Sequence, residues 1–191
     1  MDITTIIFWL AIIGFTLYII SIYNHLIRLK HNVSKAWSNI DILLKQRHDE
    51  IPKLVETCRQ YMKFEQDTLE KVMQARSQVS EARDNHDLAG LGFAEGALRM
   101  GMGQLFAVAE AYPELRANES FQHLQSRITM LENTIADRRE FYNESVNINN
   151  IGIEQFPDVI IARLFHFNSR ELLEFDASEL TDIKVKALFE N

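Results

Sequence analysis

Charged side chains that interrupt apolar helical stripes are the residues of this 191-residue chain most able to do chemistry. Arg47 and Arg138 each fall within a series of apolar residues spaced by three and four. Buried together with Glu56 or Glu132, they would form a polar network in which any unpaired charge is costly. The simpler interpretation, favoured by the sequence alone, is solvated faces with a few ion pairs between helices. The charged residues that interrupt or flank the apolar stripes are Asp41, Arg47, Glu56, Glu65, Glu132, Arg138 and Arg139.

Motifs with a built-in reaction mechanism are absent from the sequence. There is no H-E-x-x-H, C-x-x-C or G-x-S-x-G pattern and no Walker-type glycine loop. His25, His31 and His48 are not spaced by three or four, as metal ligands that share one helix face usually are. The single cysteine, Cys58, cannot form an intrachain disulfide. We therefore predict no catalytic, cofactor-binding or metal-binding residue, no cofactor, no small-molecule substrate and no enzymatic activity.

Five aromatic residues could form either a hydrophobic core or a platform for a ligand. They are Trp37, Phe64, Phe121, Phe141 and Tyr142. All five lie on or beside the expected inner faces of helices, where large aromatic side chains mostly supply apolar packing. The sequence therefore predicts that they belong to the core.

The start of the chain is apolar enough to cross a membrane. No charged residue occurs from Ile3 to Tyr23, and about 20 apolar residues span a hydrocarbon core of ~30 Å. No cleavage site for a signal peptide follows, so the span is expected to remain as an anchor. The basic residues after it are Arg28, Lys30, Lys35, Lys45 and Arg47. The positive-inside rule then places the N-terminus outside and the rest in the cytoplasm. The formal net charge of −7 gives no reason to expect nucleic-acid binding.

Helical spacing continues beyond the span, and only three prolines and seven glycines occur in the chain. The apolar or small residues of this stripe are Leu26, Leu29, Val33, Ala36, Ile40, Leu43, Ile51, Leu54, Cys58, Tyr61, Leu69, Val72, Ala75, Val79 and Ala82. They predict one long helix from the membrane to about Arg83, and therefore an elongated domain. Between Leu43 and Ile51 the stripe runs through Arg47, and Pro52 lacks a backbone donor, so we expect a kink or short break there. The phase of the stripe on both sides favours a kink.

A second helix is expected after the polar segment from Arg83 to Asp87, which predicts a chain reversal. Its inner face is marked by Leu98, Met102, Leu105 and Val108 or Ala109. The glycines crowded into this region are Gly90, Gly92, Gly96, Gly101 and Gly103. They allow two interpretations, a close approach of neighbouring helices or a segment that moves, of which we prefer the first.

A third long helix is expected after Pro113, with Asn118 as its N-cap. Its stripe comprises Phe121, Leu124, Ile128, Leu131, Ile135, Arg138, Tyr142 and Val146. Phe156-Pro157-Asp158 interrupts it before a short apolar segment, and a charged, partly ordered tail follows, with apolar residues at Leu172, Leu173, Phe175, Leu188 and Phe189. The predicted fold is all-α: a transmembrane helix continuing into an elongated antiparallel bundle of long helices. Its parts are an anchor (1–23), a cytoplasmic bundle (24–167) and a tail (168–191).

Several separated motifs, in order, resemble the bacterial LemA family. They include Tyr23-Asn24-His25-Leu26, Ala36-Trp37-Ser38-Asn39-Ile40-Asp41, Ile51-Pro52-Lys53-Leu54-Val55-Glu56-Thr57, Glu110-Ala111-Tyr112-Pro113-Glu114-Leu115, Leu131-Glu132-Asn133 and Phe141-Tyr142-Asn143. The resemblance covers about Tyr23 to Phe167. It implies an N-terminal membrane helix, an N-out topology and a bundle of long helices. The family has no established reaction, so the resemblance supplies no catalytic residue. The chain departs from the family pattern beyond Phe167 and at 146–150, where a tyrosine more often precedes asparagine.

The function expected from these features is that of a scaffold or adaptor. Such a protein would bind another protein, or a second copy of itself, through exposed faces of the bundle at the cytoplasmic membrane. An exposed apolar stripe would support this hypothesis. The alternative is an accessory factor for membrane-protein quality control by an integral-membrane protease, in which the glycine-rich segment moves. The sequence names neither the partner nor the physiological process.

Overall fold

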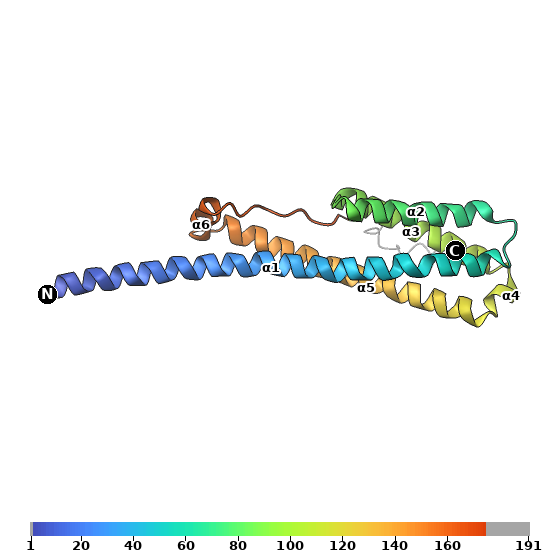
Figure 1. The fold of residues 1–191 in the computed structure, drawn as a ribbon, viewed down its shortest axis with the longest axis horizontal. Coiled ribbons are helices and arrows are strands. Elements are labelled where there is room, and N and C mark those ends of the chain that lie inside the picture. Colours follow the sequence, from blue (N-terminus) through green and yellow to red (C-terminus); the bar gives the residue numbers. More distant parts are fainter. Residues whose placement is uncertain (1, 175–191) are drawn as a thin grey trace, which may run out of the picture. The chain divides into compact units, whose positions relative to one another are not determined.

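The computed structural model describes residues 2–174, and all regular structure within them is helical. The helices are α1 (Ile3–Arg59), α2 (Gln66–Asp84), α3 (Leu88–Ala109), α4 (Pro113–Arg116), α5 (Glu119–Glu154) and α6 (Asp158–Leu164), shown in Figure 1. The all-α class with a long, apolar N-terminal helix is confirmed. Of the predicted tail, Phe175, Leu188 and Phe189 lie outside the described residues. Contacts divide the described residues into a first unit, 2–39 with 140–172, and a second unit, 40–139 with 173–174.

The apolar beginning of α1 is exposed along its whole length. This window is long and apolar enough to cross a membrane, and none of its side chains is buried. Phe8 and Leu17, for example, are 62% and 61% exposed. Apolar surface left in water costs ~25 cal/mol per Å². A segment with this much uncovered apolar surface is therefore suited to lipid.

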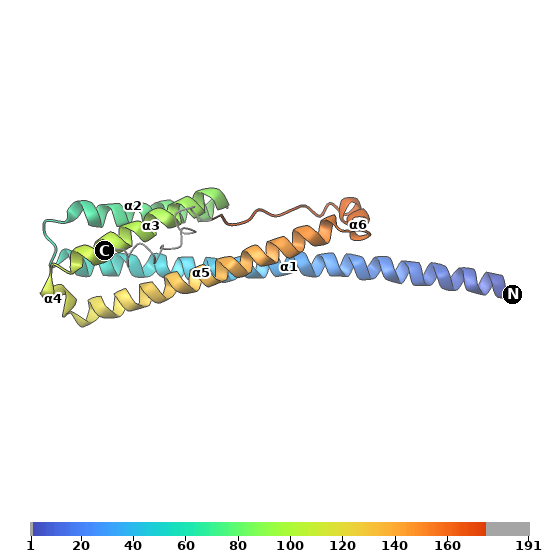
Figure 2. The same ribbon diagram turned by 180° about the vertical axis from the view of Figure 1, so that it is seen from behind.

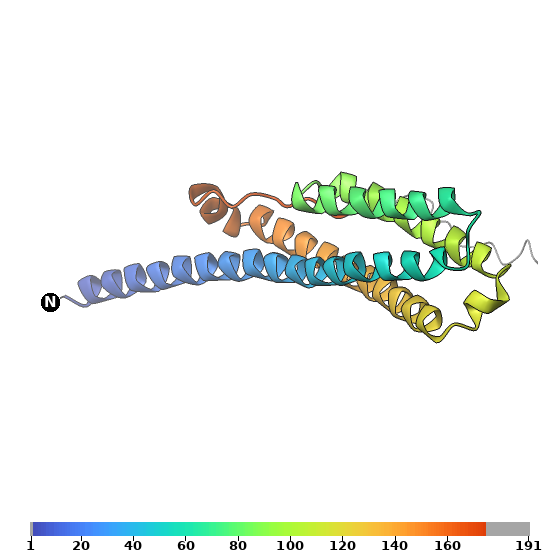
Figure 3. The same cartoon turned by 45° about the vertical axis from the view of Figure 1, so that its right-hand side comes forward.

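α1 ends at Arg59, so the prediction of one helix as far as Arg83 is wrong. Met62 takes the next inner position and is buried, and its backbone N–H donates to the Cys58 carbonyl at 2.8 Å. The chain then turns through 60–65, a loop visible in Figure 3, before α2 begins. Leu69 resumes the buried stripe seven residues after Met62, a spacing that also suits an unbroken helix. Periodicity alone therefore does not reveal this turn.

α2 and α3 form the predicted antiparallel hairpin within the second unit, and Figure 2 shows them side by side. α2 ends where His86 adopts a left-handed conformation (φ 55°). The N–H groups of His86 and Asp87 donate to the carbonyls of Arg83 and Ala82, the arrangement of a common helix end. Asp87 then caps α3, accepting from the Gly90 N–H at 2.9 Å.

Among the glycines of α3, Gly92 lies too close to another chain segment for a larger residue, because a Cβ there would collide with the backbone carbonyl of Glu174. Glu174 is not part of a helix. A Cβ at Gly101 would lie 3.5 Å from Cγ2 of Val72 on α2, an ordinary contact, and at Gly103 the space is open. The close approach of neighbouring helices therefore stays a prediction for these glycines.

The start of α5 follows the predicted capping pattern. The side chain of Asn118 accepts from the Phe121 N–H at 3.0 Å, as an N-cap does. Its amide nitrogen donates to the Tyr61 hydroxyl at 3.1 Å, which connects the start of α5 to the turn after α1. The prediction of an N-cap at Asn118 is confirmed.

The first unit pairs the early part of α1 with the late part of α5 in antiparallel directions. Leu29 lies against Gly152, and Trp37 packs edge-on to Tyr142 with ring centroids 5.7 Å apart. The segment after α6 is held on α5, because the side chain of Asn150 exchanges hydrogen bonds of 2.9 Å with both the N–H and the carbonyl of Arg170. The side chain of Asn150 therefore fixes the path of the chain after α6.

Candidate functional site

A buried ion pair between Arg47 on α1 and Glu95 on α3 is the centre of the polar site in the second unit. The two side chains are only 3% and 6% exposed, and the guanidinium donates to the carboxylate. Both residues occupy inner stripe positions, since Ile40, Leu44, Arg47, Ile51 and Leu54 on α1 recur at four and three, as do Leu91, Glu95, Leu98, Met102 and Leu105 on α3. Helical phase therefore buries both charges.

Glu132 on α5 is the second acidic member of the site. With Arg47 and Glu95 it borders a cavity of about 50 Å³ that is also lined by Arg99 and Arg139. Burial raises the pKa of the Glu132 carboxyl; Arg47 and Arg99 oppose this shift and the negative charge of Glu95 adds to it. One carboxyl oxygen of Glu132 is buried without a hydrogen-bond partner. The site can therefore hold a proton on Glu132 above the usual pH range of a glutamate.

These positions correct the sequence prediction in three places. Arg47 and Glu132 belong to a buried network, as the sharper hypothesis proposed, but Arg138 is exposed and Arg139 is buried in its place. The inner stripe continues from Ile135 by four residues to Arg139 rather than by three. Glu56 is also exposed. Glu95 was missed, although extending the stripe of Leu98 and Met102 one step toward the N-terminus reaches it.

The remaining polar candidates lie at or near the surface. Asp41 approaches Arg83 at 3.6 Å with 43% of its side chain exposed, so this pair contributes little. Glu65 is half-buried in the turn before α2. Among the described residues, no group of three or more histidine, cysteine, aspartate or glutamate side chains could hold a metal ion. Cys58 is fully buried, and burial raises the pKa of its thiol to about 12, which keeps it protonated and unreactive.

Pro52 does not break α1, because a side chain from α2 satisfies the carbonyl that the proline leaves without a partner. A proline at 52 cannot donate to the carbonyl of His48, four residues earlier. Nε of Arg76 donates to that carbonyl at 2.8 Å, and Nη2 donates to Nε2 of the His48 ring at 2.6 Å. Burial, followed by the charge of Arg76, lowers the pKa of His48, which favours the neutral ring. α1 runs unbroken through Pro52, so the alternative of a short break is wrong, and Arg76 supplies the missing bond.

The aromatic predictions divide into three that hold and two that do not. Phe121 and Tyr142 are buried, and Trp37 is half-buried against Tyr142. Phe141 is 50% exposed because the neighbouring Tyr142 takes the inner position, about 100° away around the helix. Phe64 is 92% exposed in the turn between α1 and α2. Both were assigned to the core in error.

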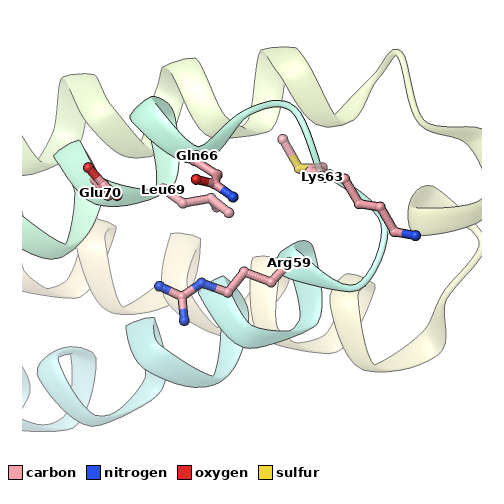
Figure 4. A pocket seen from close by; sticks show the side chains of 6 residues that line it. Arg59, Lys63, Gln66, Leu69 and Glu70 are labelled. Carbon is pink, nitrogen blue, oxygen red and sulfur yellow. The ribbon is translucent and has the colours of Figure 1, made fainter.

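A wider pocket, of about 500 Å³, lies where α1 turns into α2 (Figure 4). Its lining comes from the end of α1, the turn and the start of α2: Arg59, Met62, Lys63, Gln66, Leu69 and Glu70. In Figure 4 the guanidinium of Arg59 and the ammonium of Lys63 extend in different directions. These charges do not converge on one point, as the groups of a catalytic site would.

Replacing Glu132 with glutamine is expected to remove part of the pH dependence of stability. The folded-state pKa of Glu132 lies above its ordinary value of 4.5. Between the two pKa values the folded protein holds a proton that the unfolded chain has released, so raising the pH through this window lowers the free energy of unfolding. The Glu132→Gln variant cannot ionise there, and its stability should fall less. Urea unfolding at a series of pH values above 4.5 measures the effect.

The difference in the free energy of unfolding between wild type and Glu132→Gln, taken at each pH, separates the contribution of Glu132 from that of His48. Because the pKa of His48 is lowered from 6.5, the unfolded chain takes up that proton first, and stability is lost as the pH falls below 6.5 in both proteins. Parallel stability curves for wild type and Glu132→Gln would show that the carboxyl titrates as it does in the unfolded chain.

Fold and site together define an all-α, membrane-associated protein with an N-terminal helix long and apolar enough to cross a membrane and a buried arginine–glutamate cluster. The chain belongs to the LemA family, whose model matches residues 36–187. The resemblance seen in the separated sequence motifs is thereby confirmed.

This chain is also similar to several named proteins over most of its length. Magnetosome protein MamQ 2 of Paramagnetospirillum magneticum is 22% identical over 95% of this chain and 75% of its own length. Magnetosome protein MamQ of Magnetospirillum gryphiswaldense is 20% identical over the same shares. Protein LemA of Metamycoplasma hominis is 26% identical over 92% of this chain and 83% of its own length. None of these names states a reaction.

Proposed function

We propose that this protein is a membrane-anchored, non-enzymatic helical scaffold that binds another protein through one face of its first unit. The observation that carries the proposal is an uncovered apolar stripe on α5. Phe141, Ile148 and Ile151 are 50%, 48% and 54% exposed. Their spacing of seven and three residues places them on one side of the helix, away from the buried positions Tyr142, Val146 and Asn149. Apolar residues that gather on an exposed face are characteristic of interaction sites.

A groove beside this stripe suits a helical partner. It has a volume of about 330 Å³ and is lined by Leu29, Asn32 and Lys35 from α1 and by Phe141, Glu144, Ser145 and Ile148 from α5. An amphipathic helix binds such a groove by placing apolar side chains in it and polar side chains along its edges. Lys35 and Glu144 supply charges of both signs at those edges, so the groove can recognise a partner helix with mixed charges.

The absence of enzymatic activity is part of the same proposal. Sites for small molecules usually enclose about 300–1,000 Å³. The cavity where the polar groups Arg47, Glu95 and Glu132 converge is about 50 Å³. The arginine and glutamate side chains there also interact with one another, which favours a role in the stability of the bundle over one in a reaction.

A photo-crosslinking amino acid in place of Ile148 is expected to capture a partner protein in native membranes. Ile148→Asp should then weaken binding of that partner about tenfold or more, because it puts a charge into an apolar contact. The crosslinked protein is identified by mass spectrometry and its affinity measured with purified components. A crosslink to a second copy of the chain would assign the face to self-association, the other form of the proposed scaffold.

Ser34 provides the matched control, since it is exposed on α1 in the same unit and does not line the groove. A crosslinker at 34 should capture much less of the same partner, and Ser34→Asp should leave the affinity unchanged. Equal capture from both positions, or capture from neither, would contradict a docking face at Phe141, Ile148 and Ile151.

We further propose that Ile3–Tyr23 is the membrane anchor, with the N-terminus outside and the bundle, 24–167, on the cytoplasmic side of a bacterial inner membrane, followed by a tail at 168–191. The exposed basic residues Arg28, Lys30 and Lys35 after the span support this orientation.

A cysteine placed at Asp2 is expected to react with a membrane-impermeant maleimide in intact spheroplasts. A cysteine at Asn147 should react only after the membrane is permeabilised. The native Cys58 is buried and gives the background of the assay. The opposite labelling pattern would overturn the orientation while leaving the proposed docking face unaffected.

A further inference from the structure

Helix α6 is apolar on two opposite sides, although only one of them is covered. Its inner residues Ile161 and Ala162 are 7% and 2% exposed. On the other side, Ile160 and Leu164, four residues apart, are 57% and 67% exposed, and Phe156, two residues before the helix, is 81% exposed. A helix on a water-facing surface normally has a polar outer side. The outer side of α6 therefore needs an apolar neighbour.

The covered side of α6 packs on α1 at the end of the membrane span. Ile22 and Leu26 of α1 share a buried cluster with Ile153, Ile161 and Ala162, and Ile19, Tyr23 and Phe167 border it. The Tyr23 ring lies edge-on to Phe165 and Phe167, with centroids 4.8 and 6.0 Å away. Figures 1 and 3 show α6 folded back at the end of α5.

The position of these contacts along α1 sets the level of α6 relative to the bilayer. At 1.5 Å per residue, Ile3 to Tyr23 spans about 30 Å, so the hydrocarbon core ends near Tyr23. The cluster extends from Ile19 to Leu26, about 10 Å along the helix axis and on both sides of that boundary. α6 consequently lies where acyl chains meet headgroups, and interfacial helices insert about 5–10 Å into this zone.

The polar residues near α6 match the same environment. Arg163 flanks the exposed side of the helix. His166 and Arg170 follow the helix in sequence, Arg28 lies on the adjoining part of α1, and all three are exposed. Basic side chains at this level can meet phosphate headgroups, and aromatic residues such as Tyr23 are enriched there. The exposed apolar surface of α6, its position at the edge of the hydrocarbon core and the basic residues around it are the features expected of a helix that contacts a lipid surface.

We propose that α6 is a second membrane contact, in which Ile160 and Leu164 insert into the interfacial zone of the bilayer beside the transmembrane part of α1. The membrane then holds the first unit at two places. The proposal rests on the membrane span and is independent of the docking face on α5.

The test uses the full chain in vesicles of phosphatidylethanolamine and phosphatidylglycerol, with a nitroxide label on Ile160→Cys or, separately, Leu164→Cys. Both side chains are exposed, so labelling them leaves the packing of α6 intact, and circular dichroism verifies the helix content. At both positions, collisions with oxygen are expected to exceed collisions with a water-soluble nickel complex. The control Asn147→Cys, exposed in the same unit but farther from the span, should show the reverse. Wild-type protein, with only the buried Cys58, gives the labelling blank.

Three results would overturn the proposal. Labels on α6 that are as accessible to nickel as the label at 147 would mean that α6 faces water. Immobilised labels that neither reagent reaches would mean that a protein covers this side. Spin–spin broadening between labels would identify that protein as a second copy of the chain.

Discussion

Replacing Arg47 with methionine is expected to lower the free energy of unfolding by about 3–5 kcal/mol, the usual cost of breaking a buried ion pair at one partner. Glu95, 6% exposed, would keep its charge inside the bundle without the guanidinium that now binds it. The nearby carboxyl of Glu132, whose pKa burial already raises, would lose a favourable charge as well. The melting temperature should fall by about 10 °C, as measured by circular dichroism of the full chain in detergent micelles.

The neighbouring position 45 offers a matched control for this prediction. Lys45 is exposed on the same helix, so Lys45→Met removes a similar charge without unpairing a buried group and should change stability by less than about 0.5 kcal/mol. Adding Glu95→Leu to Arg47→Met removes both charges of the pair and should recover part of the loss. A loss no larger for Arg47→Met than for Lys45→Met would rule out a stabilising role for the pair.

Much of this architecture could be predicted because burial follows helical spacing. The span, the buried positions of α2, the reversal before α3 and the cap at Asn118 all depend on neighbours close in sequence. The choice between adjacent positions did not follow from spacing, since Arg138 and Arg139 both fit a series of threes and fours. Ile135 before and Tyr142 after are compatible with either choice, and only the structure shows that Arg139 is the buried one.

Features that depend on contacts between distant segments were beyond the sequence. The turn after Arg59 contains no proline or glycine and is held by the bond between Asn118 and Tyr61, 57 residues apart. The pairing of Arg47 with Glu95 spans 48 residues. Spacing can show that each charge is buried, but it does not show which charge on another helix lies opposite.

The contact that lets α1 continue through Pro52, made by Arg76 on another helix, was likewise not predictable from the sequence. Replacing Pro52 with alanine is expected to raise the free energy of unfolding by about 2 kcal/mol. A proline inside a helix costs ~3 kcal/mol relative to alanine, while its stiffening of the unfolded chain offsets up to about 1 kcal/mol. An alanine at 52 would supply the backbone N–H that the proline cannot donate to the His48 carbonyl. Urea unfolding of the full chain in micelles gives the measurement, and a loss of stability would mean that the proline is required for the path of α1.

In the wild-type chain, Arg76→Leu is expected to cost about 1–3 kcal/mol, because it leaves the His48 carbonyl without the donor that now lies 2.8 Å away. In the Pro52→Ala background the same change should cost about 1 kcal/mol less, since the new backbone N–H already binds that carbonyl. Lys71→Leu, at an exposed position of α2, controls for the loss of a basic side chain and should be nearly neutral in both backgrounds. If Arg76→Leu costs the same with and without Pro52, the guanidinium stabilises the protein through the His48 ring or through packing, and not by replacing the backbone bond that the proline removes.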